Sequence, residues 1–551
     1  MLSLHQYQKL RAKGEDEVKS NDLRPKDLGK PCDQLIQLDD LMPLSSPYDK
    51  PGMEPDFPEV KPEWKEKYCT SLDGCVGLDT LQRPQSEAEE QEFVQKFLSG
   101  LEKVFSDANS GVLQPLEMAF EYCAKCNTCS DACHIYKASG DNELYRPIFR
   151  ADAFRKIYNN YFSSGGKLKR KFIGADMEVN WETVARLGEL SYRCNLCRRC
   201  AQTCPLGLDN SLFAKEIRKI FSQEMGIAPT PLHNKGTELQ LKTGSSTGIG
   251  KAAFLDMVEF LEEDIEDRIG RKIKIPVDKQ GADILLIHNA GEFVAWPENP
   301  AAFAILFDEA GVDWTLSSEM MGYDSVNYGI WYDDFQAKKI VKEQMEAAKS
   351  LGVNRIVIGE CGHAHKAAGI VADRMLSWED KIPVESFLPI MWDLVRSQRL
   401  KFDPSKNDFP VTLHDPCNMV RQMGIVQPQR DILKVIAPQF REMTPHGVDN
   451  YCCGGGSGFA IMNSHNFGVF RDKVSARMKF DQILRAFPES IADSSKPKYV
   501  CAPCSNCKGS IREILKYYKT TGKFNVHYGG IVELMVNALV SIDVPYLEFL
   551  E

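Results

Sequence analysis

The sequence predicts a multidomain α+β protein, in which a helical domain is followed by two α/β repeats and the first repeat is degenerate. At 551 residues, the chain is too long for one compact domain. Hydrophobic residues make up 43% and charged residues 26%, an ordinary composition for a globular protein. The 18 cysteines gather in patterned sets, and short apolar β runs alternate with helices in the second half of the chain.

Charge and hydropathy exclude several classes of function. A formal charge of -10 argues against a nucleic-acid-binding protein, because phosphate recognition requires clustered Lys and Arg. No apolar stretch approaches the roughly 20 residues of a membrane-spanning helix. Residues 1–20 lack the apolar core of a signal peptide, so we expect a cytoplasmic protein without a transmembrane segment of its own. Thiols in that compartment indicate metal binding rather than disulfides.

Composition and periodicity divide the chain into five segments. Residues 1–115 are polar and proline-rich, apart from an amphipathic helix expected at Glu90–Ala108. We expect this extension to form an arm that binds a partner, with an unstructured tail as the alternative. The other segments are a helical domain with two cysteine motifs (116–225), a helical linker (226–280), the degenerate repeat (281–405) and a complete repeat with the C-terminal tail (406–551).

Two four-cysteine motifs lie in the helical domain. They are Cys123, Cys126, Cys129 and Cys133, and Cys194, Cys197, Cys200 and Cys204. Both read C-x2-C-x2-C-x3-C, a spacing that lets a curling backbone direct its sulfurs and N–H groups into one bowl around an anionic cluster. Zinc sites more often use separated C-x2-C pairs. The motifs therefore predict a two-cluster ferredoxin-like domain with two [4Fe-4S] clusters.

The fourth cysteine of each motif lies where the next helix begins. In two-cluster ferredoxin folds this residue ligates the other cluster. The predicted ligand sets are therefore Cys123, Cys126, Cys129 and Cys204 for one cluster, and Cys194, Cys197, Cys200 and Cys133 for the other. Cys133 is followed by His134 instead of the usual proline. We expect His134 to be a surface residue, with a hydrogen bond near the cluster as the alternative.

The α/β units occur twice in the second half of the chain. The predicted buried strands are Asp283–His288, Arg355–Ile358, Val411–His414 and Lys498–Val500, and the predicted helices between them are Pro300–Gly311 and Asp334–Leu351. Aligning the two copies places Cys361 of the first copy opposite Cys504 of the second. The other cysteines of the second copy have no counterpart. The first copy is thus predicted to retain the fold without the metal.

The second copy predicts a third metal site. Its favoured ligands are Cys417, Cys452, Cys453, Cys504 and Cys507. Cys501 faces an isoleucine of the first copy, so it is an alternate ligand or a sulfur-shuttling thiol. For the adjacent pair Cys452–Cys453, a strained vicinal disulfide or buried apolar packing is the alternative.

These motifs carry a family resemblance over residues 116 to about 540. HDPC (His414–Cys417), CCGGG (Cys452–Gly456) and the final C-x2-C resemble the CCG domain of heterodisulfide reductase-type proteins. Two ferredoxin motifs before two CCG-type repeats are similar to the HdrD subunits of heterodisulfide reductases. The degenerate copy with ECGHAHKAA (Glu360–Ala368) is most similar to the DsrK family, the cytoplasmic iron–sulfur subunits of DsrMKJOP membrane complexes.

The resemblance implies an oxidoreductase of sulfur metabolism, such as sulfate reduction, bound peripherally to the cytoplasmic face of the membrane. It would exchange electrons between a membrane cytochrome b subunit (DsrM-like) and a disulfide or trisulfide of a DsrC-like protein. The implied cofactors are two ferredoxin-type [4Fe-4S] clusters and one CCG-domain 4Fe-4S cluster, cubane or noncubane. The alternatives are an electron-relay subunit of a lactate, glycolate or glycerol-3-phosphate dehydrogenase complex, and a zinc-dependent interaction module.

Disulfide cleavage by single electrons also requires protons. His414, and His363 or His365 beside the equivalent of the C-x2-C, are candidate proton donors, with structural roles as the alternative. Cys361 is a candidate for a transient persulfide, with a buried inert thiol as the alternative. The N-terminal arm or the apolar segment Val544–Leu550 is expected to dock the membrane subunit, unless that segment packs on the last domain.

Overall fold

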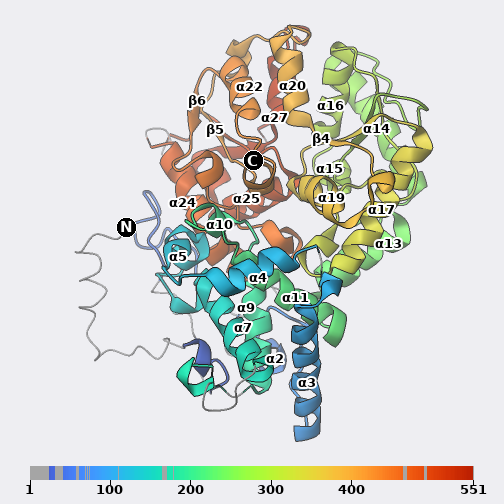
Figure 1. The fold of residues 1–551 in the computed structure, drawn as a ribbon. Coiled ribbons are helices and arrows are strands. Elements are labelled where there is room, and N and C mark those ends of the chain that lie inside the picture. The colour runs from blue at the N-terminus through green and yellow to red at the C-terminus, as the bar shows by residue number, and fades with distance from the viewer. Residues whose placement is uncertain are drawn as a thin grey trace.

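The computed structural model describes residues 24–30, 41–56, 61–68, 70, 72–73, 75–109, 111–163, 170–175, 177, 179–462, 468–488 and 493–549. Cys32, Cys69 and the first part of the predicted arm lie outside these residues. A helical half, at the bottom of Figure 1, carries an α/β half on top of it. Both repeats contact the helical half, so the loops of all three parts meet near the centre of the molecule.

The helical half is built from the N-terminal 225 residues. Its elements are η1 (Pro25–Asp27), α2 (Pro62–Tyr68), α3 (Glu87–Val104), η3 (Asp107–Asn109), α4 (Leu113–Tyr122), α5 (Thr128–Ala132), α6 (His134–Ala138), η4 (Glu143–Tyr145), α7 (Pro147–Phe162), α9 (Trp181–Tyr192), α10 (Arg199–Gln202) and α11 (Ser211–Met225). The amphipathic helix predicted at Glu90–Ala108 is α3. It begins after Ser86, whose side chain accepts a hydrogen bond from the Glu89 amide, and it packs on α9 and α11.

The next elements are α12 (Thr230–Leu232), the π-helical η5 (His233–Glu238), α13 (Leu239–Thr243) and α14 (Lys251–Ile269). Helix α14 buries Phe254, Val258, Leu261 and Ile265. These side chains spaced by three or four residues form one apolar stripe. The stripe packs against the first α/β repeat, so this helix is a layer of that repeat.

The first repeat contains a parallel sheet in the order β2-β1-β3-β4. Its strands are β1 (Ile284–Ile287), β2 (Trp314–Thr315), β3 (Arg355–Ile358) and β4 (Val384–Ser386). Its helices are α15 (Ala290–Ala295), α16 (Glu298–Glu309), η6 (Tyr328–Trp331), α17 (Asp334–Leu351), α18 (Gly362–Ala364), η7 (His365–Val371), α19 (Ala372–Met375), η8 (Trp378–Asp380) and α20 (Phe387–Arg396).

The second repeat contains a parallel sheet in the equivalent order β6-β5-β7-β8. Its strands are β5 (Val411–Leu413), β6 (Phe440–Glu442), β7 (Lys498–Cys501) and β8 (Val526–Gly529). Its helices are η9 (Pro404–Asn407), α21 (Cys417–Gln422), α22 (Pro428–Ile436), η10 (Gly447–Asp449), η11 (Gly456–Ile461), α23 (Gly468–Phe470), η12 (Arg471–Ser475), α24 (Arg477–Ala486), α25 (Ser505–Tyr517), α26 (Thr520–Phe524) and α27 (Ile531–Ala538).

The predicted fold class, a helical domain followed by two α/β repeats, is confirmed. The central strands β1, β3, β5 and β7 coincide with the predicted apolar runs. The edge strands were not predicted, because they mix polar with apolar side chains and show no continuous apolar run. β3 and β7 align residue for residue, which places Cys361 and Cys504 at equivalent positions after their strands.

The described part of the predicted arm and the segment after α27 pack on the chain's own repeats. Tyr48 of the predicted arm lies edge-on to Phe480 at 5.1 Å and donates a hydrogen bond of 2.5 Å to the Tyr518 carbonyl oxygen. At the other end, the Tyr546 hydroxyl donates to the Glu298 carbonyl oxygen at 2.5 Å, and Phe549 packs on Phe409. Among the described residues, none of the helices has the length and apolar character needed to cross a bilayer.

Candidate iron–sulfur site

The two cysteine motifs of the helical half curl in the same way. Lys125 and Asn127 of the first motif adopt the left-handed conformation, with φ of 54° and 64°. Leu196 and Arg198 occupy the same positions of the second motif, with φ of 50° and 60°. A left-handed residue between successive cysteines turns the backbone sharply, so both loops wind around a centre as their spacing predicted.

The fourth cysteine of each motif lies with the other motif. Burial raises the pKa of the Cys129 thiol to about 11, and Cys123, Cys126 and Cys204 are close enough to raise it further. Burial likewise raises the pKa of Cys133 to about 12, and its cysteine neighbours are Cys197 and Cys194. The structure therefore brings together the members of each predicted ligand set. Thiolates are the preferred ligands of iron–sulfur clusters, so both sets suit that cofactor.

A third group of thiols gathers in the second repeat. The Cys452 thiol lies within hydrogen-bonding reach of Cys417 and Cys453, and Cys507 lies within reach of Cys453 and Cys504. Cys417 begins α21, Cys504 caps α25 and Cys507 lies in its first turn. Four of these residues are buried and Cys417 is half-buried. Five soft donors from three separate segments can hold an iron–sulfur cofactor, with Cys417 nearest to solvent.

Backbone amides surround these thiols. The amides of Gly454 and Gly455 approach the Cys452 and Cys453 sulfurs at 3.5 and 3.4 Å. Gly454 has φ of 88°, and a Cβ there would lie 2.6 Å from Ala476, so only glycine fits. Inward-pointing N–H groups stabilise an anionic cluster.

The degenerate repeat forms one wall of the site. The Gly362 amide donates to the Cys504 sulfur at 3.2 Å, and a Cβ at Gly362 would lie 3.0 Å from that sulfur. Asn506 of the second repeat lies 2.5 Å from His363 of the first. The copy that carries no cysteine motif of its own therefore closes the cysteine site of the other copy.

Cys501 is not brought to the thiol group. It is the last residue of β7, and its side chain joins the core that contains Tyr499, whereas Val500 joins the core that contains Cys453 and Cys504. Side chains alternate across a strand, so Cys501 faces away from the other five cysteines. Its charged neighbours include Glu360, Glu533 and Lys508. Because the Cys501 side chain lies in a different core from the other five cysteines, the sequence-based suggestion that it is an alternate ligand is corrected.

The candidate histidines lie at different distances from the thiols. A ring nitrogen of His414 lies within 4.8 Å of the Cys453 and Cys507 sulfurs. His365 instead contacts the Cys361 carbonyl oxygen at 2.7 Å and the Ser386 hydroxyl at 2.8 Å, a structural position. Burial lowers the pKa of His365 to about 4 and that of His363 to about 3, so both are neutral at physiological pH.

Cys361 is buried beside Cys504. Burial raises the pKa of Cys361 to about 12, and the neighbouring Cys504 raises it further. The thiol is therefore protonated at physiological pH, as expected for an inert buried cysteine.

Asn195, between two cysteines of the second motif, joins that motif to the third thiol group. Its side chain donates to the Gly454 and Gly456 carbonyl oxygens at 3.1 and 3.3 Å. It also lies 2.8 Å from His134, which is 2% exposed and so is not the surface residue that the sequence suggested. The Cys197 thiol lies within reach of Cys452, which places the second motif in direct contact with the third group.

Further polar residues that the motifs did not reveal support this junction. Arg421 donates to the Cys197 carbonyl oxygen at 2.7 Å and to the carbonyl oxygens of Val448 and Asn450. The buried Lys479 donates to the Asn450 side chain at 2.7 Å. Burial lowers the pKa of Lys479 to about 7. Neither residue belongs to a recognisable motif, because each acts through contacts between segments distant in sequence.

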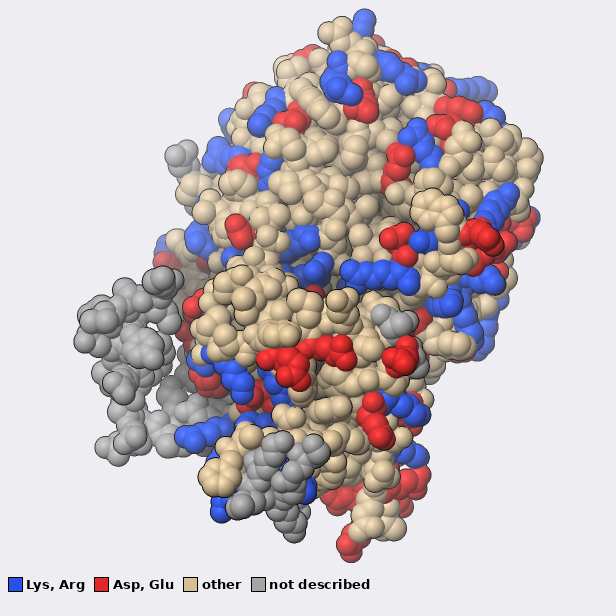
Figure 2. Space-filling model, viewed as in Figure 1, with Lys and Arg blue, Asp and Glu red and all other residues tan. Residues whose placement is uncertain are grey.

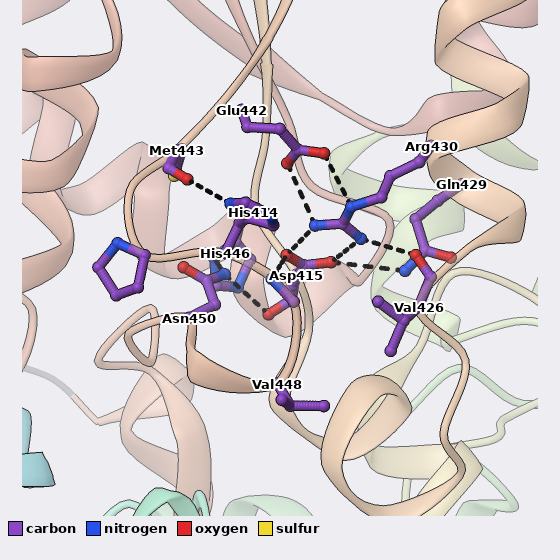
Figure 3. A network of polar contacts seen from close by, with 12 residues as sticks. His414, Asp415, Val426, Gln429, Arg430, Glu442, Met443, His446, Val448 and Asn450 are labelled. Carbon is purple, nitrogen blue, oxygen red and sulfur yellow. Dashed lines mark hydrogen bonds and ion pairs between the residues drawn. The ribbon is translucent and has the colours of Figure 1, made fainter.

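An ion-pair network fixes the loop that carries His414 and Cys417 (Figure 3). Arg430 donates to the Asp415 carboxylate at 2.8 and 2.6 Å and pairs with Glu442 at 2.8 Å. The Gly447 amide donates to Asp415 at 2.6 Å. Although burial opposes the shift, the Arg430 and Gly447 hydrogen bonds lower the pKa of Asp415 below its usual value. Asp415 is thus a charged anchor for the turn before Cys417.

We expect Arg430→Met to destabilise the second repeat by about 3 kcal/mol, because it leaves the buried Asp415 carboxylate without its cation. The deficit should be present at neutral pH and should shrink as pH falls, because burial without Arg430 raises the pKa of Asp415 in the variant and a proton then replaces the cation. It should be gone before the depressed pKa of Asp415 in the unsubstituted protein is reached. Denaturation followed between pH 3 and 8 measures this. Arg441→Met is the control, since Arg441 lies next to Glu442 on β6 and takes no part in this network. Equal losses in both variants would contradict the assignment.

A groove lies next to this junction. Its cavity of about 780 Å³ lies between the helical half and the first repeat, and it is lined by α4, α11, α17, η7 and α19. Leu196, between two cysteines of the second motif, and Gln422, at the end of α21, lie in its wall. Its cations include Arg198, Lys215 and Lys366. Figure 2 shows a band of Lys and Arg between the two halves.

Comparisons with known proteins agree with this arrangement. Residues 119–208 match the family described as 4Fe-4S dicluster domain, and residues 411–512 match the Cysteine-rich domain (CCG). The chain is 25% identical over 514 residues to the "Hdr-like menaquinol oxidoreductase iron-sulfur subunit 2" of Archaeoglobus fulgidus, which covers 85% of this chain and 89% of the relative.

Two further relatives are more distant. A dihydromethanophenazine:CoB--CoM heterodisulfide reductase subunit of Methanosarcina acetivorans is 23% identical, over 62% of this chain and 79% of that protein. "EtfAB:quinone oxidoreductase" of Syntrophomonas wolfei is 24% identical, over 67% of this chain and 52% of that protein. These similarities support an iron–sulfur oxidoreductase subunit of heterodisulfide reductase-like type that carries 4Fe-4S clusters.

Proposed function

We propose that this heterodisulfide reductase-like subunit is catalytic and cleaves, or reversibly forms, a disulfide or trisulfide of a small DsrC-like protein. The observation that carries the proposal is the contact between Cys197 of the second motif and Cys452 of the third thiol group. A pure relay has no need for five additional thiols beside its second cluster. We propose a DsrK-type role, with electrons supplied by a membrane cytochrome b subunit at the cytoplasmic face.

The proposed ligands are the two swapped ferredoxin sets and the group Cys417, Cys452, Cys453, Cys504 and Cys507. When bound there, iron–sulfur clusters carry electrons one at a time, which is the chemistry that two-step cleavage of an S–S bond requires. Cys200 lies near Cys129 of the other set as well as near Cys194 and Cys197, so neighbouring sets form a continuous series. This series runs from the helical half to the third group.

The chain's own residues would admit and position the thiol substrate. The groove reaches Gln422, the last residue of α21, and the first residue of that helix is Cys417, the half-buried member of the third group. Lys366 lies 4.8 Å from the Trp331 ring and in the wall of the groove, where burial lowers its pKa to about 7, so it attracts anionic groups in its protonated form. His414 is the candidate that would hold a proton nearest to the thiols.

Electron paramagnetic resonance of the iron-loaded protein tests the proposal. We expect the spectrum of the oxidised protein to change on addition of a substrate thiol, because the thiol binds at the third group. Cys501→Ser should retain the response, since Cys501 faces another core. A spectrum that does not change with thiols would instead favour an electron-relay subunit of a dehydrogenase complex. A colourless, iron-free protein would indicate the zinc-dependent module.

A further inference from the structure

A buried cluster of charges lies between the two repeats, behind the third thiol group. The Lys508 ammonium lies 3.5 Å from the nearest oxygen of Glu292, 3.5 Å from Glu360 and 3.4 Å from Glu533. All four residues are at most 2% exposed. If every group were ionised, three carboxylates would face one cation. Unpaired charge in the protein interior is strongly unfavourable, so the cluster favours an additional proton.

The hydrogen bonds of the carboxylates locate this proton. One Glu360 oxygen accepts from the Ile531 and Val532 amides at 2.7 and 3.2 Å, and the other accepts from the Asn299 side chain at 3.1 Å. Two carboxylate oxygens of the cluster, Glu292 Oε1 and Glu533 Oε2, are buried without a hydrogen-bond donor among the described residues. Glu292 Oε1 faces the Lys508 ammonium at 3.5 Å, whereas Glu533 contacts Lys508 through its other oxygen. A proton bound to Glu533 Oε2 would turn this unpaired acceptor into a hydrogen-bond donor.

The two carboxylates also approach each other. A Cβ placed on Gly530 would lie 1.9 Å from Glu360 Oε2 and 2.3 Å from Glu533 Oε2, so both oxygens crowd the same small space beside this glycine. Two ionised oxygens in such proximity repel, whereas a proton on one lets it donate to the other. The pair then titrates as a unit.

We propose that Glu360 and Glu533 form a proton-binding site that takes up a proton when the third thiol group's cofactor is reduced and releases it for thiol formation. This inference rests on the proposed function. Cleavage of a disulfide consumes two electrons and two protons and yields two thiols, and the pair supplies one of these protons. Solvent supplies the second proton and afterwards reprotonates the carboxylate pair.

The position of the cluster couples it to the thiols. Lys508 follows Cys507 on α25, and the Glu360 carbonyl oxygen accepts from the amide of Ser505 at 2.6 Å, directly after Cys504. An electron arriving at the thiol group adds negative charge close to α25. Because the intervening medium is protein rather than water, that charge raises the proton affinity of the pair.

Groups on every neighbouring element set the affinity of the pair. Besides Lys508, the described residues that face it are Glu292 on α15, Glu298 on α16, Tyr499 and Cys501 on β7, and Tyr546 of the C-terminal segment, with His288 3.6 Å from Glu292. Burial and then the Glu533 carboxylate raise the pKa of Glu360 to about 8. Burial raises the pKa of Glu298 to about 7, and its partial exposure offers a connection to solvent.

Infrared spectroscopy of the iron-loaded protein tests this site directly. We expect a protonated-carboxyl C=O band that disappears between pH 7 and 9, shifts in heavy water, and grows on reduction at pH 9. Glu533→Gln should lack the band, because its amide can donate permanently to Glu360 in place of the proton. Glu385→Gln, which removes an exposed carboxylate of β4, should retain it. Absence of the band in the unsubstituted protein would refute the proton site without any variant.

Redox titration supplies the second readout. The midpoint potential of the third cluster should fall by up to about 59 mV per pH unit around the pKa of the pair, the value for one proton per electron. In Glu533→Gln this slope should flatten, while the ferredoxin-type clusters are unaffected. If the infrared band titrates with pH but does not change on reduction, the coupling between the proton site and the third cluster is wrong. If the infrared band does respond to reduction but the paramagnetic resonance spectrum does not respond to thiols, only the proposed function is wrong.

Discussion

Replacing Cys453 with Ala is expected to remove about one third of the protein-bound iron, since one of three proposed clusters loses its central ligand. Cys453 lies within reach of both Cys452 and Cys507, so its sulfur joins the two halves of the third group. Disulfide reduction should be lost with the iron. The two ferredoxin-type clusters should remain reducible, because their proposed ligands belong to the helical half. Iron and sulfide quantification together with resonance spectroscopy measures both effects.

Cys501→Ala is the matched control for this experiment. Cys501 is also a buried cysteine of the second repeat, but its side chain lies in the core with Tyr499. It should therefore keep all of the iron and the thiol response. An unchanged iron content in Cys453→Ala, or an equal loss in both variants, would remove the third site from this description of the protein.

Lys508→Met should cause a large loss of stability, about 5 kcal/mol in the second repeat. The substitution keeps the length of the side chain but leaves Glu292, Glu360 and Glu533 without their shared cation. The loss should be greatest at high pH, where the carboxylates are ionised. It should shrink as pH falls toward the raised pKa of Glu360, about 8, because without Lys508 the carboxylates bind protons already above that value.

Lys516→Met provides the control, because Lys516 lies on the same helix α25 but is exposed. Exposed substitutions of this kind change stability by roughly 0.5 kcal/mol or less. Chemical denaturation between pH 6 and 10, with amide hydrogen exchange in α25, compares the two variants. If Lys508→Met proved as stable as Lys516→Met at every pH, the buried charges could not be interacting as the geometry requires.

The degenerate repeat has a structural role at the site of the second repeat. It has lost the cysteines of its counterpart, yet Gly362 donates to the Cys504 sulfur and Glu360 caps the first turn of α27. The first copy thus encloses the site of the second and contributes the buried acid beside it. Since the surrounding contacts join the two copies, we expect neither repeat to form the complete site alone.

Sequence patterns predicted the parts of the protein whose ligands or side chains are close in sequence. Each ferredoxin-type loop is specified by spacing, because four cysteines within eleven residues can only curl around a shared centre. The central strands β1, β3, β5 and β7 were predicted for the same reason, since a buried strand is a short continuous apolar run. The edge strands and the burial of His134 escaped prediction, because both depend on what packs against them.

The sequence by itself determined the two cluster-binding loops, the doubled α/β unit and the cysteines able to bind a third cluster. Only the tertiary structure decided that Cys501 faces away from that group, that Cys197 meets Cys452, and that acids from both repeats surround Lys508. The physical reason is the range of the interactions. Spacing and periodicity encode contacts within one loop, helix or strand, whereas these three features arise where separately folded layers pack together, and no local pattern records that packing.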